Sequence, residues 1–215
     1  SPFLRDAVVA TEDRRFWWHP GLDPQGIASA MRINMSEGRA PWSGNGGSTI
    51  TQQTAKLLCL GRPYDPSAWE DEAAYEADCR RTTLARKAEE AVYALAMEWR
   101  YTKEEILTIY LNRAYLGAGT RGFEAAARRY FGIPAADVDP AQAAMLAGLL
   151  KAPTTFAPTG DLARSQGRAA VVIGLMAEQG YLSPGQARDA LLNPARLSPG
   201  AQARTGGAFA DWVMD

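Results

Sequence analysis

Signals for helix starts recur along the chain, and signals for strands are almost missing. Asp23-Pro24, Asp139-Pro140 and Ser183-Pro184 each join a side chain that can cap a helix to a proline that fits its first turn. Proline suits that position because the first N–H groups of a helix have no partner inside it. The sequence therefore predicts an all-α fold.

Capping residues, prolines and glycines of this kind predict where most helices begin and end. We expect helices over residues 24–35, 48–60, 84–100, 102–112 and 123–130, one starting at 140, one ending at Gly180 and one from 184. Ser67 to Glu70 has the form of a capping box and predicts a short acidic surface helix. Leu84, Ala88, Ala91 and Leu95 mark one apolar face of the helix over 84–100. Glycine and proline indicate a mobile loop over 38–47.

Composition narrows the class of protein. The chain has 215 residues, of which 47% are hydrophobic and 22% charged, so it can bury a substantial core. Its net charge is −1, so the chain lacks the excess of basic residues that attracts nucleic acid, and we expect no nucleic-acid partner. The most apolar run, 143–150, is far too short to cross a bilayer. The first residue is not Met, and both ends have the look of cuts in a longer protein.

Two adjacent acids stand in the stretch from Ala10 to Asp23. Glu12 and Asp13 end an apolar segment, and His19, the single histidine, follows in a turn made by Pro20 and Gly21. An acid at a helix end can reach into a cleft and act as a base. The alternative is an ordinary helix end with solvated acids.

Glycines lead into a polar helix start at Gly46 to Gln53. Such a start exposes backbone N–H groups and the positive end of the helix dipole, which suit a phosphate or pyrophosphate. The neutral side chains that could add donors are Ser48, Thr49, Thr51, Gln52 and Gln53. Simple helix capping is the alternative, and it needs only one of them.

Two cations and one acid share a face of the next long helix. Arg86, Lys87 and Glu90 lie three and four residues apart, whereas Glu89 does not fit the spacing. In isolation this pattern is most often a solvated ion-pair face. Farther along, Lys103 to Asn112 combines a lysine, apolar residues that can pack, and a terminal asparagine.

Taken together and in this order, these four stretches resemble the four signatures of the peptidoglycan glycosyltransferase domain, the lipid II polymerase of bacterial cell-wall synthesis. Lys56 falls where that family carries a lysine facing the cleft. The segments 117–127, 131–132 and 149–153 also look like the family, so the resemblance runs from about Ala7 to Pro158.

The resemblance implies a fold and a domain layout. The expected fold is a lysozyme-like α-helical large lobe with a smaller membrane-facing lobe. Residues 1–196 would form the glycosyltransferase domain, and 197–215 a linker with the start of a following segment. Residues 209–213 resemble the lead into the transpeptidase domain of bifunctional penicillin-binding proteins.

The resemblance also implies roles for single residues. Glu12 would be the catalytic base, and Glu90 would orient the cations or hold a divalent metal, Mg²⁺ or Mn²⁺. Asp13 and His19 would orient Glu12 and close the turn. The expected substrate-binding residues are Asp13, Phe16, His19, Ser48, Thr49, Thr51, Gln52, Gln53, Lys56, Arg86, Lys87 and Asn112.

The implied reaction joins lipid II to a lipid-linked glycan chain at the outer face of the bacterial inner membrane, on the periplasmic side. The anchor would lie outside this chain, and other cell-wall synthesis proteins would be partners. Side chains that could dip into the membrane surface are Trp17, Trp18, Met31, Ile33, Met35 and Trp42, although several would equally suit a core.

The chain departs from the family pattern in two places. Thr120-Arg121 stands where a small residue and an aromatic are more usual, which can alter a cleft wall. The segment 62–83 is longer than the usual connection. Cys79 within it could form a disulfide with Cys59 in an oxidising compartment. A buried thiol at Cys59 and an unrelated exposed Cys79 are the alternative.

Two other functions fit parts of the pattern. A lysozyme-type muramidase would use paired acids on a helical scaffold but has no use for an anion site with nearby cations. A non-catalytic glycan-binding or scaffold domain would not need Glu12 and Glu90 in their signatures.

Overall fold

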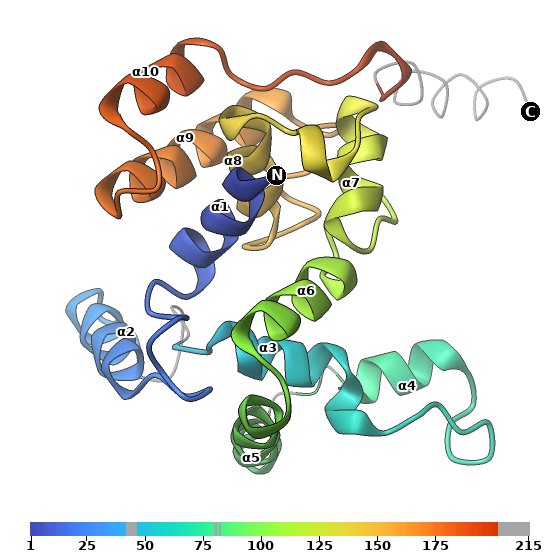
Figure 1. Ribbon diagram of the computed structural model, residues 1–215. Helices are drawn as coiled ribbons and strands as arrows, with labels where there is room; N and C mark the ends of the chain where they lie inside the picture. The colour runs from blue at the N-terminus through green and yellow to red at the C-terminus, as the bar shows by residue number, and fades with distance from the viewer. Residues whose placement is uncertain (42–46, 80, 82, 202–215) are drawn as a thin grey trace, which may run out of the picture. The chain divides into compact units, whose positions relative to one another are not determined.

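The computed structural model describes residues 1–41, 47–79, 81 and 83–201, and within them it is built of helices (Figure 1). No strand occurs in these ranges, where the one β-bridge joins Tyr115 and Arg121. The all-α prediction is therefore confirmed. The helices are α1 (Pro2–Glu12), α2 (Pro24–Ser36), α3 (Ile50–Leu57), the 3₁₀ turn η1 (Cys59–Gly61), α4 (Glu72–Cys79), α5 (Leu84–Arg100), α6 (Lys103–Arg113), α7 (Phe123–Phe131), η2 (Ala135–Asp137), α8 (Pro140–Leu149), α9 (Leu162–Glu178) and α10 (Pro184–Leu192).

The chain divides into two compact units. The first unit comprises Ser1–Arg14 and Leu111–Asp215, and the second comprises Arg15–Tyr110. Two units agree with the two lobes that the resemblance implied. The expected boundary at residue 196 stays a prediction, and residues 202–215, which include the expected 209–213 segment, lie outside the described residues.

The first unit is built around α8. Asp139 caps this helix in a capping box with Gln142, as the sequence predicted. From Ala143 to Leu149 every residue of α8 is buried, as a helix that is apolar all round must be. Helices α1, α7, α9 and α10 pack around it, and α1 and α9 also contact each other.

The second unit is built on the contact between α3 and α5. Ile50 and Ala55 of α3 are buried, and so are Ala94 and Met97 of α5. Apolar burial of this kind contributes roughly 1.5–3 kcal/mol for each large side chain. Phe16 and three residues of α6, Ile106, Leu107 and Tyr110, are also buried in this unit, together with Cys59, Leu60 and Cys79.

The helix predicted over 48–60 ends earlier than expected. Thr49 caps α3, but α3 stops at Leu57, and Cys59, Leu60 and Gly61 follow with φ angles of 55°, 54° and 71°. These left-handed conformations cannot continue a right-handed helix, and each costs a residue other than glycine about 1–2 kcal/mol. The sequence showed Gly61 as a stop but gave no sign that two bulkier residues would share its conformation.

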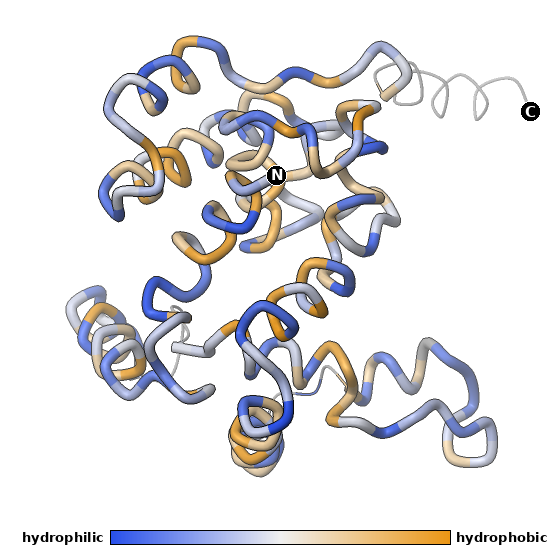
Figure 2. Tube along the Cα trace, in the orientation of Figure 1, coloured by the Kyte–Doolittle hydropathy of each residue, from blue (hydrophilic) through white to orange (hydrophobic). Residues whose placement is uncertain are grey.

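The capping box predicted at Ser67 is wrong. Both the backbone N–H and the hydroxyl of Ser67 donate to Asp65 Oδ1, which makes a turn instead of a helix start. Helix α4 begins at Glu72, and the Asp71 carboxylate accepts the N–H of Ala74. A short acidic helix is therefore present, but it begins at Glu72 and not at the predicted capping box over residues 67–70. Figure 2 shows the segment leading to it as mainly hydrophilic.

The apolar face predicted for α5 does not face the core. Leu84 is 87% exposed and Leu95 is also exposed, whereas Arg86 and Glu90 are buried. The inward face of α5 packs against the polar start of α3, where charged side chains find partners. Hydrophobic spacing alone could not show that the polar face of this helix is the inner one.

The turn before α7 yields a stability prediction. Gly117 and Gly119 both have φ above 70°, but only at Gly117 would a Cβ meet a backbone atom, the carbonyl oxygen of Pro153 at 2.6 Å. We expect Gly119→Ala to lower the free energy of unfolding by about 1–2 kcal/mol, from backbone strain alone. Gly117→Ala should cost about 1–3 kcal/mol more, because the clash adds overpacking.

Urea denaturation of the two variants measures the difference. Equal losses of stability would show that the approach of Gly117 to Pro153 imposes no constraint.

Candidate functional site

Glu12 lies where the sequence placed it, at the end of α1 in the first unit. It is the last residue of α1 and is half-buried, and Asp13 next to it is buried. The end of α1 is held to α9, because Gln179 Nε2 donates to the carbonyl of Ala10 and Arg14 pairs with Glu178 at 3.0 Å. A carboxylate at a fixed helix end meets the requirement for a positioned base.

The turn after Glu12 belongs to the second unit and closes on itself. His19 Nδ1 accepts the N–H of Gly21 at 3.1 Å, so His19 closes the turn as predicted. Thr49 Oγ1 donates to the Gly21 carbonyl at 2.6 Å and thereby ties the turn to the start of α3. The prediction that His19 and Asp13 orient Glu12 is not tested by these contacts.

Asp23 ends this turn and begins α2. Its carboxylate accepts the N–H of Gly26, as an N-cap does, and receives two hydrogen bonds from Arg15 at 3.2 and 2.7 Å. Burial raises the pKa of Asp23, but the hydrogen bonds from Arg15 and Gly26 outweigh burial and hold the pKa below its ordinary value.

Most polar side chains at the start of α3 bond within the protein. Thr49 and Gln52 form a capping box, with both hydrogen bonds at 3.1 Å. Thr51 donates to Glu98, and Gln53 accepts the hydroxyl of Tyr110. The helix capping that the sequence analysis gave as an alternative is therefore present at Thr49 and Gln52. Gly46 lies outside the described residues, so the glycine lead into the helix is only partly visible.

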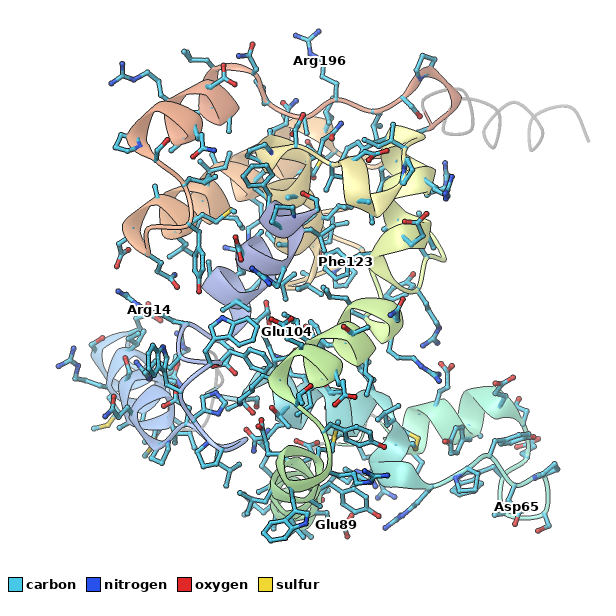
Figure 3. The ribbon with its side chains drawn as sticks, viewed as in Figure 1. Arg14, Asp65, Glu89, Glu104, Phe123 and Arg196 are labelled. Atoms are coloured by element: carbon cyan, nitrogen blue, oxygen red, sulfur yellow. A yellow bond between two sulfur atoms is a disulfide. The ribbon has the colours of Figure 1, made fainter. Side chains whose placement is uncertain are left out.

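Ser48 joins the second signature to the third. Lys87 Nζ donates to Ser48 Oγ at 2.6 Å and to Glu90 Oε2 at 2.9 Å. Glu90 is only 5% exposed. The pair therefore differs from the solvated ion-pair face that was the alternative prediction from the spacing. Lys87 keeps 43% of its side chain exposed and can meet a ligand. The neighbouring Glu89, shown in Figure 3, lies on the exposed side of α5.

Arg86 is buried beside the end of α4. Its Nη2 donates to the carbonyl of Cys79 at 3.3 Å, and Nη1 lies 3.7 Å from Glu89 Oε2. Nε is buried and has no hydrogen-bond partner in the part of the chain that the structure describes. One buried donor of this guanidinium is therefore unsatisfied within the described residues, and its charge is incompletely compensated.

The structure joins Cys59 and Cys79 in a disulfide, with Cα atoms 5.0 Å apart (Figure 3). Both residues are buried, so the alternative of an unrelated exposed Cys79 does not hold in this structure. A loop of this size contributes on the order of 3 kcal/mol through the unfolded state. That is comparable with the cost of the left-handed turn in which Cys59 lies.

Three further residues were predicted to bind substrate. Lys56 is half-buried in the last turn of α3, and Asn112 is exposed on the part of α6 that belongs to the first unit. Phe16 is fully buried in the second unit, which is a core position. Thr120, one of the departures from the family pattern, closes the glycine turn through a hydrogen bond to the Gly117 carbonyl.

The sequence reasoning missed Glu98. Its Oε1 accepts the hydroxyl of Thr51 at 2.6 Å and pairs with Lys103 Nζ at 2.7 Å, so it joins α3, α5 and α6. Lys103 Nζ also lies 4.5 Å from the centre of the Phe16 ring, which is a cation–π distance. Glu98 follows the buried Ala94 by four residues, and that spacing was the available signal.

The carboxylate of Glu90 is paired with an ammonium group, which agrees with the predicted role of orienting cations. No cluster of three or more His, Cys, Asp or Glu side chains able to hold a metal occurs within the described ranges. The divalent cation stays a prediction.

Among the helices of the described part of the chain, none combines the length and the apolar character that a bilayer crossing requires.

Comparisons with known proteins agree on one family. The model of the family described as "Transglycosylase" matches residues 1–177. Penicillin-binding protein 1A of Aquifex aeolicus is 38% identical over 98% of this chain and 26% of its own length. A protein of Cupriavidus necator named as a transglycosylase is 38% identical over 90% of this chain and 74% of its own length. A crystal structure of penicillin-binding protein 1A from Haemophilus influenzae is 40% identical, covers 45% of this chain and 14% of that one, and has a TM-score of 0.43.

The relatives named penicillin-binding protein 1A are longer than this chain. The chain spans about a quarter of the Aquifex aeolicus protein, at 26%, and 20% of the relative from Haemophilus influenzae.

The bonds of Asp23 predict a pH-dependent effect on stability. Asp23→Asn keeps a side chain that can cap α2 but removes the charge that pairs with Arg15. Because the folded-state pKa is lowered, the wild type should be more stable than the variant by up to about 1 kcal/mol above the ordinary pKa of aspartate. That advantage should disappear as the pH falls through the lowered pKa of the folded state.

Urea unfolding at neutral pH and near pH 3 tests this expectation. Asp139→Asn is the matched control, because Asp139 caps α8 with Gln142 and not with an arginine. A difference between wild type and Asp23→Asn that stays constant with pH would contradict the assignment.

Proposed function

The chain belongs to the transglycosylase family, and we propose that it is a peptidoglycan glycosyltransferase that polymerises lipid II into β-1,4-linked glycan strands. The observation that carries the proposal is the hydrogen-bonded set formed by Ser48, Lys87 and the buried Glu90, which joins two of the family's signatures in one place. A cation held this way beside a helix start suits a diphosphate leaving group.

In the proposed reaction, the 4-hydroxyl of one sugar attacks the anomeric carbon of a glycan held on undecaprenyl pyrophosphate. The new C–O bond forms as the bond to pyrophosphate breaks. An α-linked donor that gives a β-linked product requires inversion, so attack comes from the face opposite the leaving group. One base must take the hydroxyl proton, and Glu12 is the residue proposed for this role because it is a carboxylate on a fixed helix end.

The leaving pyrophosphate needs its charge stabilised more than it needs a proton. Lys87 is partly exposed and is oriented by Glu90, so its ammonium group can bind a phosphate oxygen. Arg86 is proposed to add a second positive charge through its guanidinium, and Lys56 is the third cation proposed for this role. Each of these groups stabilises negative charge that grows as the bond breaks.

A divalent cation remains a proposal without a defined site in this chain. Glu90 is paired with Lys87, and no step of the mechanism above passes through a metal ion. The proposed place of action is the outer face of the inner membrane, where lipid-linked substrates lie. Exposed apolar side chains of the second unit support a membrane surface as partner, with Trp18 at 86% exposure and Met35 and Ile33 also exposed.

Other side chains expected at the membrane are less clear candidates. Trp17 and Met31 are only half-exposed, and Trp42 lies outside the described residues. A following transpeptidase domain is part of the proposal and agrees with the greater length of the relatives. Contacts with other cell-wall synthesis proteins are also part of the proposal. The muramidase and scaffold alternatives gain no support from the family match.

The proposal predicts polymerisation of labelled lipid II in detergent and its inhibition by moenomycin. Glu12→Gln should lower turnover by about 10³-fold or more while lipid II binding changes little, because the amide keeps the shape but cannot take a proton. Gel analysis of the products measures turnover, and arms with and without a divalent cation test the metal. Wild-type turnover in Glu12→Gln would remove Glu12 from the role of base, and no polymer from the wild type would remove the function.

The neighbouring acids of α5 give a matched pair of variants. Glu90→Gln leaves Lys87 without the charged partner that orients it, so we expect polymerisation to fall by about 10–100-fold, as for a lost charge-assisted hydrogen bond. Glu89→Gln weakens the longer contact to Arg86, at 3.7 Å, from an acid with 45% of its side chain exposed, so it should lower polymerisation by less than Glu90→Gln does. Initial rates at several lipid II concentrations compare the two variants. Equal losses would contradict a specific role for Glu90.

A further inference from the structure

We propose that the disulfide between Cys59 and Cys79 positions Arg86 for binding a substrate phosphate. The inference rests on the proposed function and adds to it a positioning element that lies in the lengthened segment of this chain. The groups involved all belong to the second unit.

The link from the disulfide to Arg86 is a direct contact. Cys79 is the last residue of α4, and its carbonyl accepts Arg86 Nη2 at 3.3 Å. The nearest carboxylate contact of this guanidinium, to Glu89, is longer at 3.7 Å. Arg86 is only 8% exposed, so moving the carbonyl would leave a buried charge with fewer partners. The place of Cys79 therefore helps to set the direction of the guanidinium.

Helix α4 has eight residues, too few for stability by itself. It packs against the short turn η1, and its last residue, Cys79, also accepts a hydrogen bond from Arg86 of α5. Tyr75 donates to the carbonyl of Arg62 at 2.6 Å, but Arg62 belongs to the same surface segment. The covalent bond to Cys59 is the contact that joins the end of α4 to the end of α3.

The other end of the disulfide lies in a defined conformation. Cys59 and Leu60 are left-handed and buried, so the turn after α3 is held by its surroundings and not by its own preference. Breaking the bond would release this turn and the end of α4 together. The expected consequence is a displaced Cys79 carbonyl and a guanidinium that is no longer held in one direction.

Reduction of the full protein tests the inference. A water-soluble phosphine converts the disulfide to two thiols and becomes its oxide with the oxygen of water, so no other reactant is needed. We expect reduction to raise the Kd for fluorescent lipid II by about tenfold, which is the effect of misplacing one charge-assisted hydrogen bond, with a smaller change in kcat. In Arg86→Ala the same reduction should raise the Kd by less than about twofold, because the group that the disulfide positions is absent.

Further measurements separate positioning from stability. The Cys59→Ala/Cys79→Ala variant should bind lipid II like the reduced wild type and not respond to the phosphine. Arg81→Ala is the control for loss of a nearby arginine, since Arg81 is exposed and pairs with Asp78, and its response to reduction should equal that of the wild type. Circular dichroism checks that the reduced forms stay folded.

Two results would overturn the inference. One is a reduced wild type with an unchanged Kd, and the other is an equal rise of Kd on reduction in wild type and Arg86→Ala. The NMR signal of the Arg86 Nε–H, identified by its absence from Arg86→Lys, reports the position of the guanidinium without any substrate and should shift on reduction. If the Arg86 signal shifts on reduction but the protein does not polymerise lipid II, the proposed function is wrong. If the protein polymerises lipid II but the signal does not shift, the positioning of Arg86 by the disulfide is wrong.

Discussion

The second unit depends on the ion pair between Lys87 and the buried carboxylate of Glu90. A carboxylate that is almost fully removed from water would cost several kcal/mol if it stood alone. Lys87 compensates it at 2.9 Å and also donates to Ser48, the residue before the cap of α3. The pair therefore fixes the start of α5 against the start of α3. It also leaves the exposed part of the lysine beside a helix N-terminus, where an anion is favoured.

Thr49 extends this arrangement to the turn that precedes α2. Its side chain oxygen accepts the N–H of Gln52 to cap α3, while its hydroxyl donates to the Gly21 carbonyl. His19 closes the same turn from the other side through Gly21 N–H. A change at Thr49 would therefore disturb both the helix cap and the turn. Segments separated by about thirty residues are held in register by one small side chain, and so the family's signatures in this unit form one structure.

The starts of helices could be predicted from the sequence, because the physics of a start is local. Asp23, Asp139 and Ser183 cap their helices with their own side chains, within three residues of where they stand. The end of α3 could not be predicted in the same way. Its left-handed turn is bonded through Cys59 to a residue twenty positions away, and no local rule indicates that. The chemistry of Glu98 was missed for a similar reason, since its partners Thr51 and Lys103 come from two other helices.

A comparison of α8 with α5 explains why the second unit needs these polar and covalent links. Helix α8 buries an apolar surface on all sides, and such a helix is stable wherever it is surrounded by other apolar residues. Helix α5 instead buries Arg86 and Glu90 and leaves Leu84 in solvent, so its inner face gains less from the hydrophobic effect. Charged groups inside a protein are stabilising only when they are paired with good geometry. The cap at Thr49, the pair of Glu98 with Lys103 and the disulfide each hold such geometry in place. Thr49, Lys87 and Arg86 are thus proposed for substrate binding and also take part in the contacts that hold this unit together.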